Sequence, residues 1–183
     1  LNETCRQARE WQDEGLVPNF GINVSPRELR QPDFHTRMVG TIAAYGLDPS
    51  RFVVELTESA WSLEASRVMP VLHDLRARGF ALAIDDFGAG YSSLWRLREL
   101  PVQIIKVDRA FLTGVPDDRE ACAIYSAIMQ LVDTVNCDVV AEGVETAEQL
   151  SFLSSLGWLR QYWGAACTCA PSLAAACHGQ RGS

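Results

Sequence analysis

The sequence has no long hydrophobic run, because charged residues interrupt every apolar segment before the roughly 18 residues that a membrane-spanning helix needs. Its first residues, LNETCRQAREWQDEG, are polar and periodic and lack the apolar middle of a secretory signal peptide. These absences predict a cytoplasmic chain that has no membrane segment.

Positive charge is scarce as well. The chain has 16 Lys and Arg against 23 Asp and Glu, a formal net charge of −7, and no stripe of basic residues. A protein that binds duplex nucleic acid concentrates Lys and Arg on one face, so no duplex nucleic-acid partner is expected. A small anionic ligand remains compatible with the charge, because bound cations can invert the local field.

No Gly-x-Gly-x-x-Gly motif follows the first predicted strand, so a dinucleotide-binding fold lacks its main support. At 183 residues, 48% of them hydrophobic, the chain suits one domain with a real core. Composition changes abruptly near the end, where Ala and Cys become frequent. We therefore expect one domain over residues 1–161 and a degenerate or poorly structured tail over residues 162–183.

The sequence does show a regular alternation of amphipathic helices and short apolar strands. The strands are predicted at residues 20–24, 52–57, 80–84, 102–107 and 138–141. Capping boxes at Ser25–Glu28 and Thr146–Gln149 mark two helix starts, and the first of these helices is expected to continue to Gly46. Apolar strands separated by helices are typical of parallel strands covered on both faces, which leaves a doubly wound sheet or a (β/α) barrel.

Five predicted strands end in, or close to, a polar residue that a buried core should avoid. Taken alone, any of these side chains could be a cap or a buried hydrogen bond, but carboxylates are rarely buried without a partner. Side chains at the carboxyl ends of parallel barrel strands converge on one mouth. Carboxylates meeting there would repel one another unless cations lay between them. The set comprises Asn23, Glu55, Asp85, Asp86, Lys106 and Glu142.

The donor types indicate the chemistry of such a site. Oxygen ligands without His or Cys favour Mg²⁺ or Mn²⁺, and the adjacent Asp85 and Asp86 could hold two ions for a phosphoester displacement. Lys106 fits as a cation near the phosphate or the nucleophilic water, and Glu142 as a general base or a ligand. The rival interpretation is a Schiff-base lysine in an aldolase-like barrel. Acidic neighbours would hold Lys106 protonated, which disfavours that role.

Five segments, taken in order, resemble the EAL family of (β/α) barrels that linearise cyclic-di-GMP. The most specific is the ten-residue stretch Asp85 to Leu94, which reads Asp-Asp-Phe-Gly-Ala-Gly-Tyr-Ser-Ser-Leu. The others are Asn23-Val24-Ser25, Glu55-Leu56-Thr57-Glu58, Ile105-Lys106-Val107-Asp108 and Ala141-Glu142-Gly143-Val144-Glu145.

This resemblance implies a role for each matching residue. Lys106 would position the nucleophilic water, Glu142 would be the general base or a nearby ligand, and Glu58 would stabilise the loop after Asp85. Asp108 and Gln161 would lie on the substrate side. The implied metal ligands, in a site for two Mg²⁺ or Mn²⁺ ions, are Asn23, Glu55, Asp85 and Asp86. The implied partners are cyclic-di-GMP, a second copy in a homodimer, and sensory or GGDEF domains in the parent protein.

The sequence departs from the family pattern in two respects. The Glu-Ala-Leu motif that names the family is absent, and the family's Gln-Gly-Tyr is replaced by Gln161-Tyr162-Trp163. We therefore expect a partial TIM-like barrel lacking about the first two strands, with an exposed apolar edge and low solubility. Two functions stay open. One is metal-dependent hydrolysis of cyclic-di-GMP to linear pGpG, and the other is a catalytically inactive EAL module that binds cyclic-di-GMP or a protein partner.

Overall fold

A computed structural model of the protein describes residues 1–57, 60, 65–88, 97–157 and 168–169. The chain divides into two compact units, Leu1–Ile84 with Leu94–Gln103 and Asp85–Ser93 with Ile104–Ser183. Strand β3 (Ala81–Phe87) gives its first four residues to the first unit and its last three to the second. Every helix in the described residues is too short or too polar to cross a membrane.

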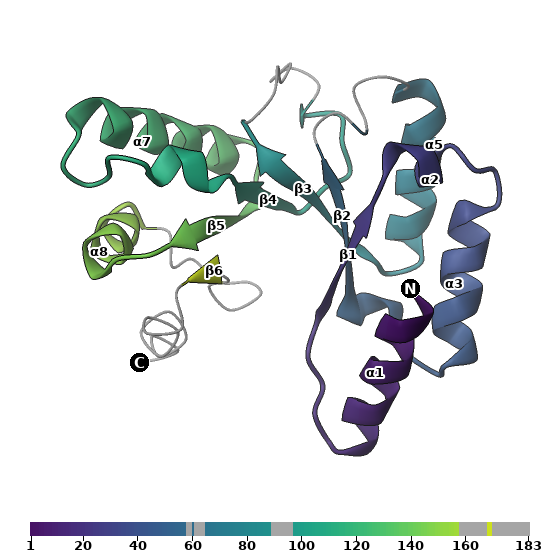
Figure 1. Cartoon of the computed structure of the whole chain (residues 1–183). Helices are drawn as coiled ribbons and strands as arrows, with labels where there is room; N and C mark the ends of the chain where they lie inside the picture. Colours follow the sequence, from purple (N-terminus) through teal and green to yellow (C-terminus); the bar gives the residue numbers. More distant parts are fainter. Residues whose placement is uncertain (58–59, 61–64, 89–96, 158–167, 170–183) are drawn as a thin grey trace. The chain divides into compact units, whose positions relative to one another are not determined.

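The first unit alternates helices with strands in the order α1 to β3 (Figure 1). Strands β1 and β2 are parallel neighbours, and β2 is followed in the sheet by β3. Helix α3 contacts α1, α2 and α5. The elements are α1 (Asn2–Asp13), β1 (Phe20–Val24), α2 (Pro26–Leu29), α3 (Phe34–Ala44), η1 (Pro49–Arg51), β2 (Phe52–Thr57) and α5 (Ala65–Ala77).

Burial alternates along β2 and so fixes which face each side chain occupies. Phe52, Val54 and Leu56 are buried in the core of the first unit, whereas the residues between them are half-buried. Successive side chains of a strand point to opposite faces, so Glu55 lies on the face away from Val54 and Leu56. The core thus holds β2 in place while Glu55 stays accessible.

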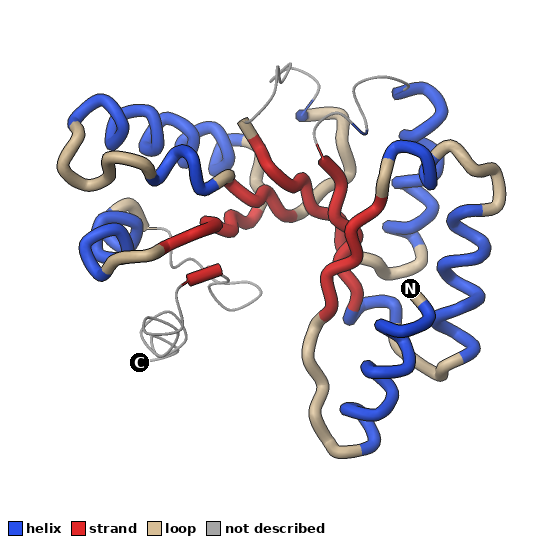
Figure 2. The backbone as a smooth tube through the Cα atoms, in the orientation of Figure 1, coloured by secondary structure: helices blue, strands red, loops and turns tan. Residues whose placement is uncertain are grey.

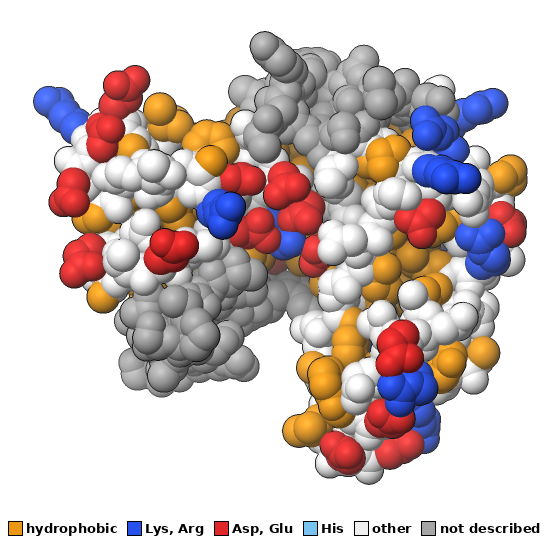
Figure 3. Space-filling model, viewed as in Figure 1, with side chains coloured by type: hydrophobic (Ala, Val, Ile, Leu, Met, Phe, Trp, Pro, Cys, Tyr) orange, Lys and Arg blue, Asp and Glu red, His pale blue; other side chains and the backbone are white. Residues whose placement is uncertain are grey.

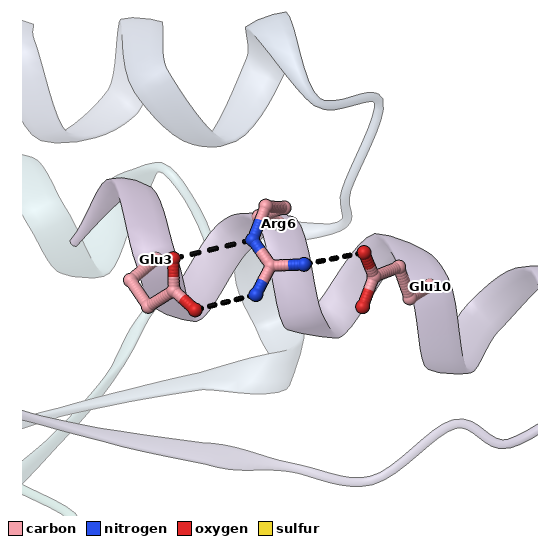
Figure 4. Close-up of polar contacts among 3 residues, drawn as sticks. All are labelled: Glu3, Arg6 and Glu10. Carbon is pink, nitrogen blue, oxygen red and sulfur yellow. Dashed lines mark hydrogen bonds and ion pairs between the residues drawn. The ribbon is translucent and has the colours of Figure 1, made fainter.

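Helix α1 presents a charged face to solvent and buries Cys5 and Ala8. Acidic and basic side chains alternate over it (Figure 3). Arg6 lies between Glu3 and Glu10 and pairs with both at 2.5 Å, one helical turn away on each side (Figure 4). Pairs at this spacing support a surface helix modestly, so packing of the apolar face supplies most of its stability.

The second unit contains the end of β3 followed by strands β4 to β6 in sequence order. Strands β4 and β5 are parallel, as are β5 and β6. Helices α7 and α8 lie side by side (Figure 2), with the rings of Tyr125 and Phe152 in edge-to-face contact at 6.3 Å between centroids. The elements are β4 (Ile104–Val107), η2 (Arg109–Leu112), α7 (Arg119–Thr134), β5 (Asp138–Val144), α8 (Ala147–Ser155) and β6 (Thr168–Cys169).

The alternating pattern and the parallel neighbours confirm the predicted α/β class. Both capping boxes form, and β1 and β2 have the predicted bounds. The single helix predicted from Ser25 to Gly46 is wrong, because α2 ends at Leu29 and α3 begins at Phe34. Pro32 lies in that break, where it cannot donate a helical hydrogen bond and disfavours helical geometry in the residue before it.

Candidate metal centre

In the first unit, two predicted ligands are brought side by side. Asn23 of β1 lies directly opposite Glu55 of β2 in the parallel register. Asn23 is exposed and Glu55 is half-buried. A Cβ atom on Gly21 would overlap the Glu55 carboxylate, so the absence of a side chain at Gly21 leaves the space that this carboxylate occupies. The unit therefore presents an amide and a carboxylate on adjacent strands.

In the second unit, three strands bring a lysine between two carboxylates. The Lys106 Nζ of β4 lies 2.6 Å from Asp85 Oδ1 of β3 and 2.9 Å from Glu142 Oε1 of β5. The three side chains are only 14%, 15% and 20% exposed, in that order. Partial burial weakens screening by solvent, so the ammonium group compensates both carboxylates strongly.

Asp86 adds a third carboxylate to this cluster. One oxygen from each of Asp85, Asp86 and Glu142 can be chosen so that all three lie within 4.8 Å of one another. Neighbouring strand residues normally point to opposite faces, but Asp86 has a left-handed backbone with φ 54°. Its pKa is raised by partial desolvation and by the charges of Asp85 and Asp108, and Lys106 opposes that rise.

The donor set fits a hard divalent cation. Its atoms are carboxylate oxygens, which Mg²⁺ and Mn²⁺ prefer, and they converge closely enough to share one ion. The ammonium group of Lys106 already places one positive charge beside Asp85 and Glu142. We name Asp85, Asp86, Lys106 and Glu142 the acidic cluster.

The remaining predicted site residues have different outcomes. Asp108 accepts a hydrogen bond from the Ala110 N–H at 2.6 Å and so caps the 3₁₀ turn η2, a structural role that the sequence did not indicate. Its predicted place on the substrate side stays a prediction. Glu58 and Gln161 lie outside the described residues, and their predicted roles stay predictions too.

Sequence reasoning missed two residues of η2, the turn that follows Lys106. Phe111 packs against Gly88, and the stem of Arg109 packs against Gly143. The only local signal was the pair of glycines, each of which comes one or two residues after a carboxylate of the acidic cluster.

Comparison with known proteins identifies the family. The EAL domain family model matches residues 1–160. The chain belongs to the EAL family. This EAL chain is 39% identical over 158 residues to the bifunctional diguanylate cyclase/cyclic di-GMP phosphodiesterase MucR of Pseudomonas aeruginosa, covering 86% of the chain and 23% of MucR. It is 44% identical over 154 residues to the cyclic di-GMP phosphodiesterase NbdA of the same organism, covering 84% of the chain and 20% of NbdA.

Solved structures show the same fold. The EAL chain matches a complex of the MucR phosphodiesterase with c-di-GMP at a TM-score of 0.78 and 39% identity, covering 85% of the chain and 64% of that structure. It matches a manganese and c-di-GMP complex of BlrP1 from Klebsiella pneumoniae at a TM-score of 0.76 and 32% identity, covering 85% of the chain and 40% of that structure. The chain spans about a fifth of the length of MucR and NbdA. It shares the α/β fold of the EAL structures.

Proposed function

We propose that this chain is the part of a cyclic-di-GMP phosphodiesterase that carries most of its metal site, and that its strands belong to an EAL-type barrel. The hydrolysis would yield linear pGpG. The observation that carries the proposal is the acidic cluster, in which three carboxylates and one lysine from neighbouring strands converge. Relatives whose names specify this activity are 32% to 44% identical to the chain.

The residues of the cluster have separate tasks in this proposal. Asp85 and Asp86 would hold Mg²⁺ or Mn²⁺ through their carboxylate oxygens. When bound, these ions lower the pKa of water and neutralise the charge that develops on the phosphate. Lys106, kept protonated by Asp85 and Glu142, orients the nucleophilic water and the phosphate through its ammonium group.

Glu142 is the proposed proton acceptor. Its carboxylate accepts from Lys106 Nζ through Oε1, which leaves the second oxygen as a further acceptor. A general base must lie within hydrogen-bond reach of the proton that it removes. The proposal therefore places the attacking water beside Glu142 and Lys106.

The test is hydrolysis of cyclic-di-GMP by the full-length protein with Mg²⁺ or Mn²⁺. The reaction is measured as the appearance of linear pGpG. Asp85→Asn should reduce the turnover number by roughly 100-fold or more, because it removes a charged ligand and the charge that pairs with Lys106. Arg78→Gln is the matched control, since it breaks an exposed ion pair with Asp74 in the first unit.

Calorimetry on the same proteins separates the two candidate functions. Binding of cyclic-di-GMP by the wild type without turnover would favour the inactive binding module over the enzyme. Unchanged turnover in Asp85→Asn would remove Asp85 from the site.

A further inference from the structure

The turn η2 directly follows the strand that carries Lys106 and is held by a hydrogen bond at each end. Asp108 accepts from the Ala110 N–H at its start, at 2.6 Å. At its end, Gln149 of α8 donates through Nε2 to the Leu112 carbonyl oxygen at 3.2 Å, and the Leu112 side chain is buried. The turn is therefore a fixed element with two side chains, Arg109 and Phe111, that face glycines.

The first contact lies beside Asp85 and Asp86. Gly88 has φ 93°, and a Cβ atom there would lie 2.5 Å from Cε2 and Cζ of the Phe111 ring. A real Cβ atom could not lie so close, so the Phe111 ring packs directly on the backbone only because position 88 is a glycine. Gly88 follows Asp86 by two residues, and Phe87 between them is buried.

The second contact lies beside Glu142. Gly143 has φ 67°, and a Cβ atom there would lie 2.6 Å from Arg109 Cβ and 3.4 Å from Arg109 Cδ. The aliphatic stem of Arg109 therefore packs on the backbone immediately after Glu142. One short turn thus contacts both backbone segments that carry the carboxylates of the acidic cluster.

We propose that η2 is a brace for the acidic cluster, with Phe111 and the stem of Arg109 as positioning residues. The inference rests on the proposed function, because it concerns the same site. Glycine is the residue with the greatest backbone freedom, so a backbone at Gly88 and Gly143 without a packing partner would sample many conformations. The brace removes that freedom and keeps Asp85 and Asp86 within reach of Glu142.

Phe111→Ala is the direct test. Hydrogen exchange of the peptide that contains residues 85–88, measured without divalent ions, should become faster than in the wild type. The dissociation constant for Mn²⁺ should rise roughly tenfold. Mutations of residues that contact metal ligands without binding the metal typically have an effect of this size. In the full-length protein, kcat for cyclic-di-GMP should fall with little change in KM.

Two further variants make this test specific. Phe152→Ala also removes a half-buried ring from the second unit, and it should leave both the exchange of residues 85–88 and the Mn²⁺ affinity unchanged. Phe111→Leu keeps an apolar contact with Gly88 and should restore most of the affinity. If Phe111→Ala and Phe152→Ala change exchange and affinity equally, the brace is wrong.

The Arg109 contact is tested by removing its charge and its stem separately. Arg109→Met keeps the stem and should bind Mn²⁺ like the wild type, whereas Arg109→Ala should bind more weakly. Equal weakening by both variants would assign Arg109 an electrostatic role and overturn its part in the brace. Faster exchange in Phe111→Ala with no hydrolysis by the wild type would support the brace and reject the proposed function.

Discussion

At the scale of single residues, the ammonium group of Lys106 balances two carboxylates in a partly buried place. Replacing Lys106 with Met leaves Asp85 and Glu142 facing each other without a counter-charge. We expect the free energy of unfolding in urea at pH 7, without divalent ions, to fall by about 3 kcal/mol. Added Mg²⁺ should then stabilise this variant more than it stabilises the wild type.

The matched control for Lys106→Met is Arg78→Met, which breaks an ion pair with Asp74 at 2.7 Å. The two side chains of that pair are 45% and 36% exposed, so its loss should change stability little. Equal effects of the two variants would show that the burial of the Lys106 pairs contributes nothing special.

The residues that carry chemistry were easier to predict than the residues that support them. Asp85, Asp86, Lys106 and Glu142 stand out in the sequence because each places a charge at the end of an apolar strand. Phe111 does not stand out, since a phenylalanine after a strand is ordinary and its partner Gly88 lies 23 positions earlier. Such a contact depends on the tertiary fold and leaves no local pattern.

At the scale of elements, the capping box of α8 shows how local sequence determines a helix start. Thr146 Oγ1 accepts from the Gln149 N–H at 3.1 Å, and Gln149 Oε1 accepts from the Thr146 N–H at 3.2 Å. Thr146→Ala should lower the free energy of unfolding by about 1 kcal/mol, measured in urea. Thr146→Ser, which keeps the hydroxyl, is the control and should remain close to the wild type.

Element boundaries followed the sequence where the signal was local. The strand at residues 20–24 ends before the helix cap Ser25, and the strand at residues 52–57 begins after a turn capped by Asp48, so these two limits could be predicted. Strand β3 continues three residues beyond the predicted Ile84, through Asp85 and Asp86 to Phe87. Two charged residues looked like the end of a strand, but compensation by Lys106 allows the strand to continue through them.

At the scale of the whole molecule, the net charge of −7 favours association with divalent cations. An ion that binds only the folded chain stabilises it according to its concentration and affinity. At 100 times its dissociation constant, Mn²⁺ should therefore raise the free energy of unfolding by about 2.7 kcal/mol. Urea unfolding of the full chain with and without Mn²⁺ measures this difference.

The ligand-deficient variant controls for general ion effects. Asp85→Asn should lose most of the stabilisation by Mn²⁺, and monovalent salt at equal ionic strength should not reproduce it. Full stabilisation of Asp85→Asn by Mn²⁺ would place the ion elsewhere in the chain.

Lys106 is the sole lysine among the 183 residues. Apart from the terminal α-amino group, a reagent that acylates primary amines thus has one target, and that target lies 2.6 Å from Asp85. Acylation requires the deprotonated amine, which the two carboxylates disfavour, so slow modification reports an intact cluster and faster modification reports its opening. Intact-mass spectrometry after brief acylation would therefore read the state of this centre directly, without substrate and without an engineered label.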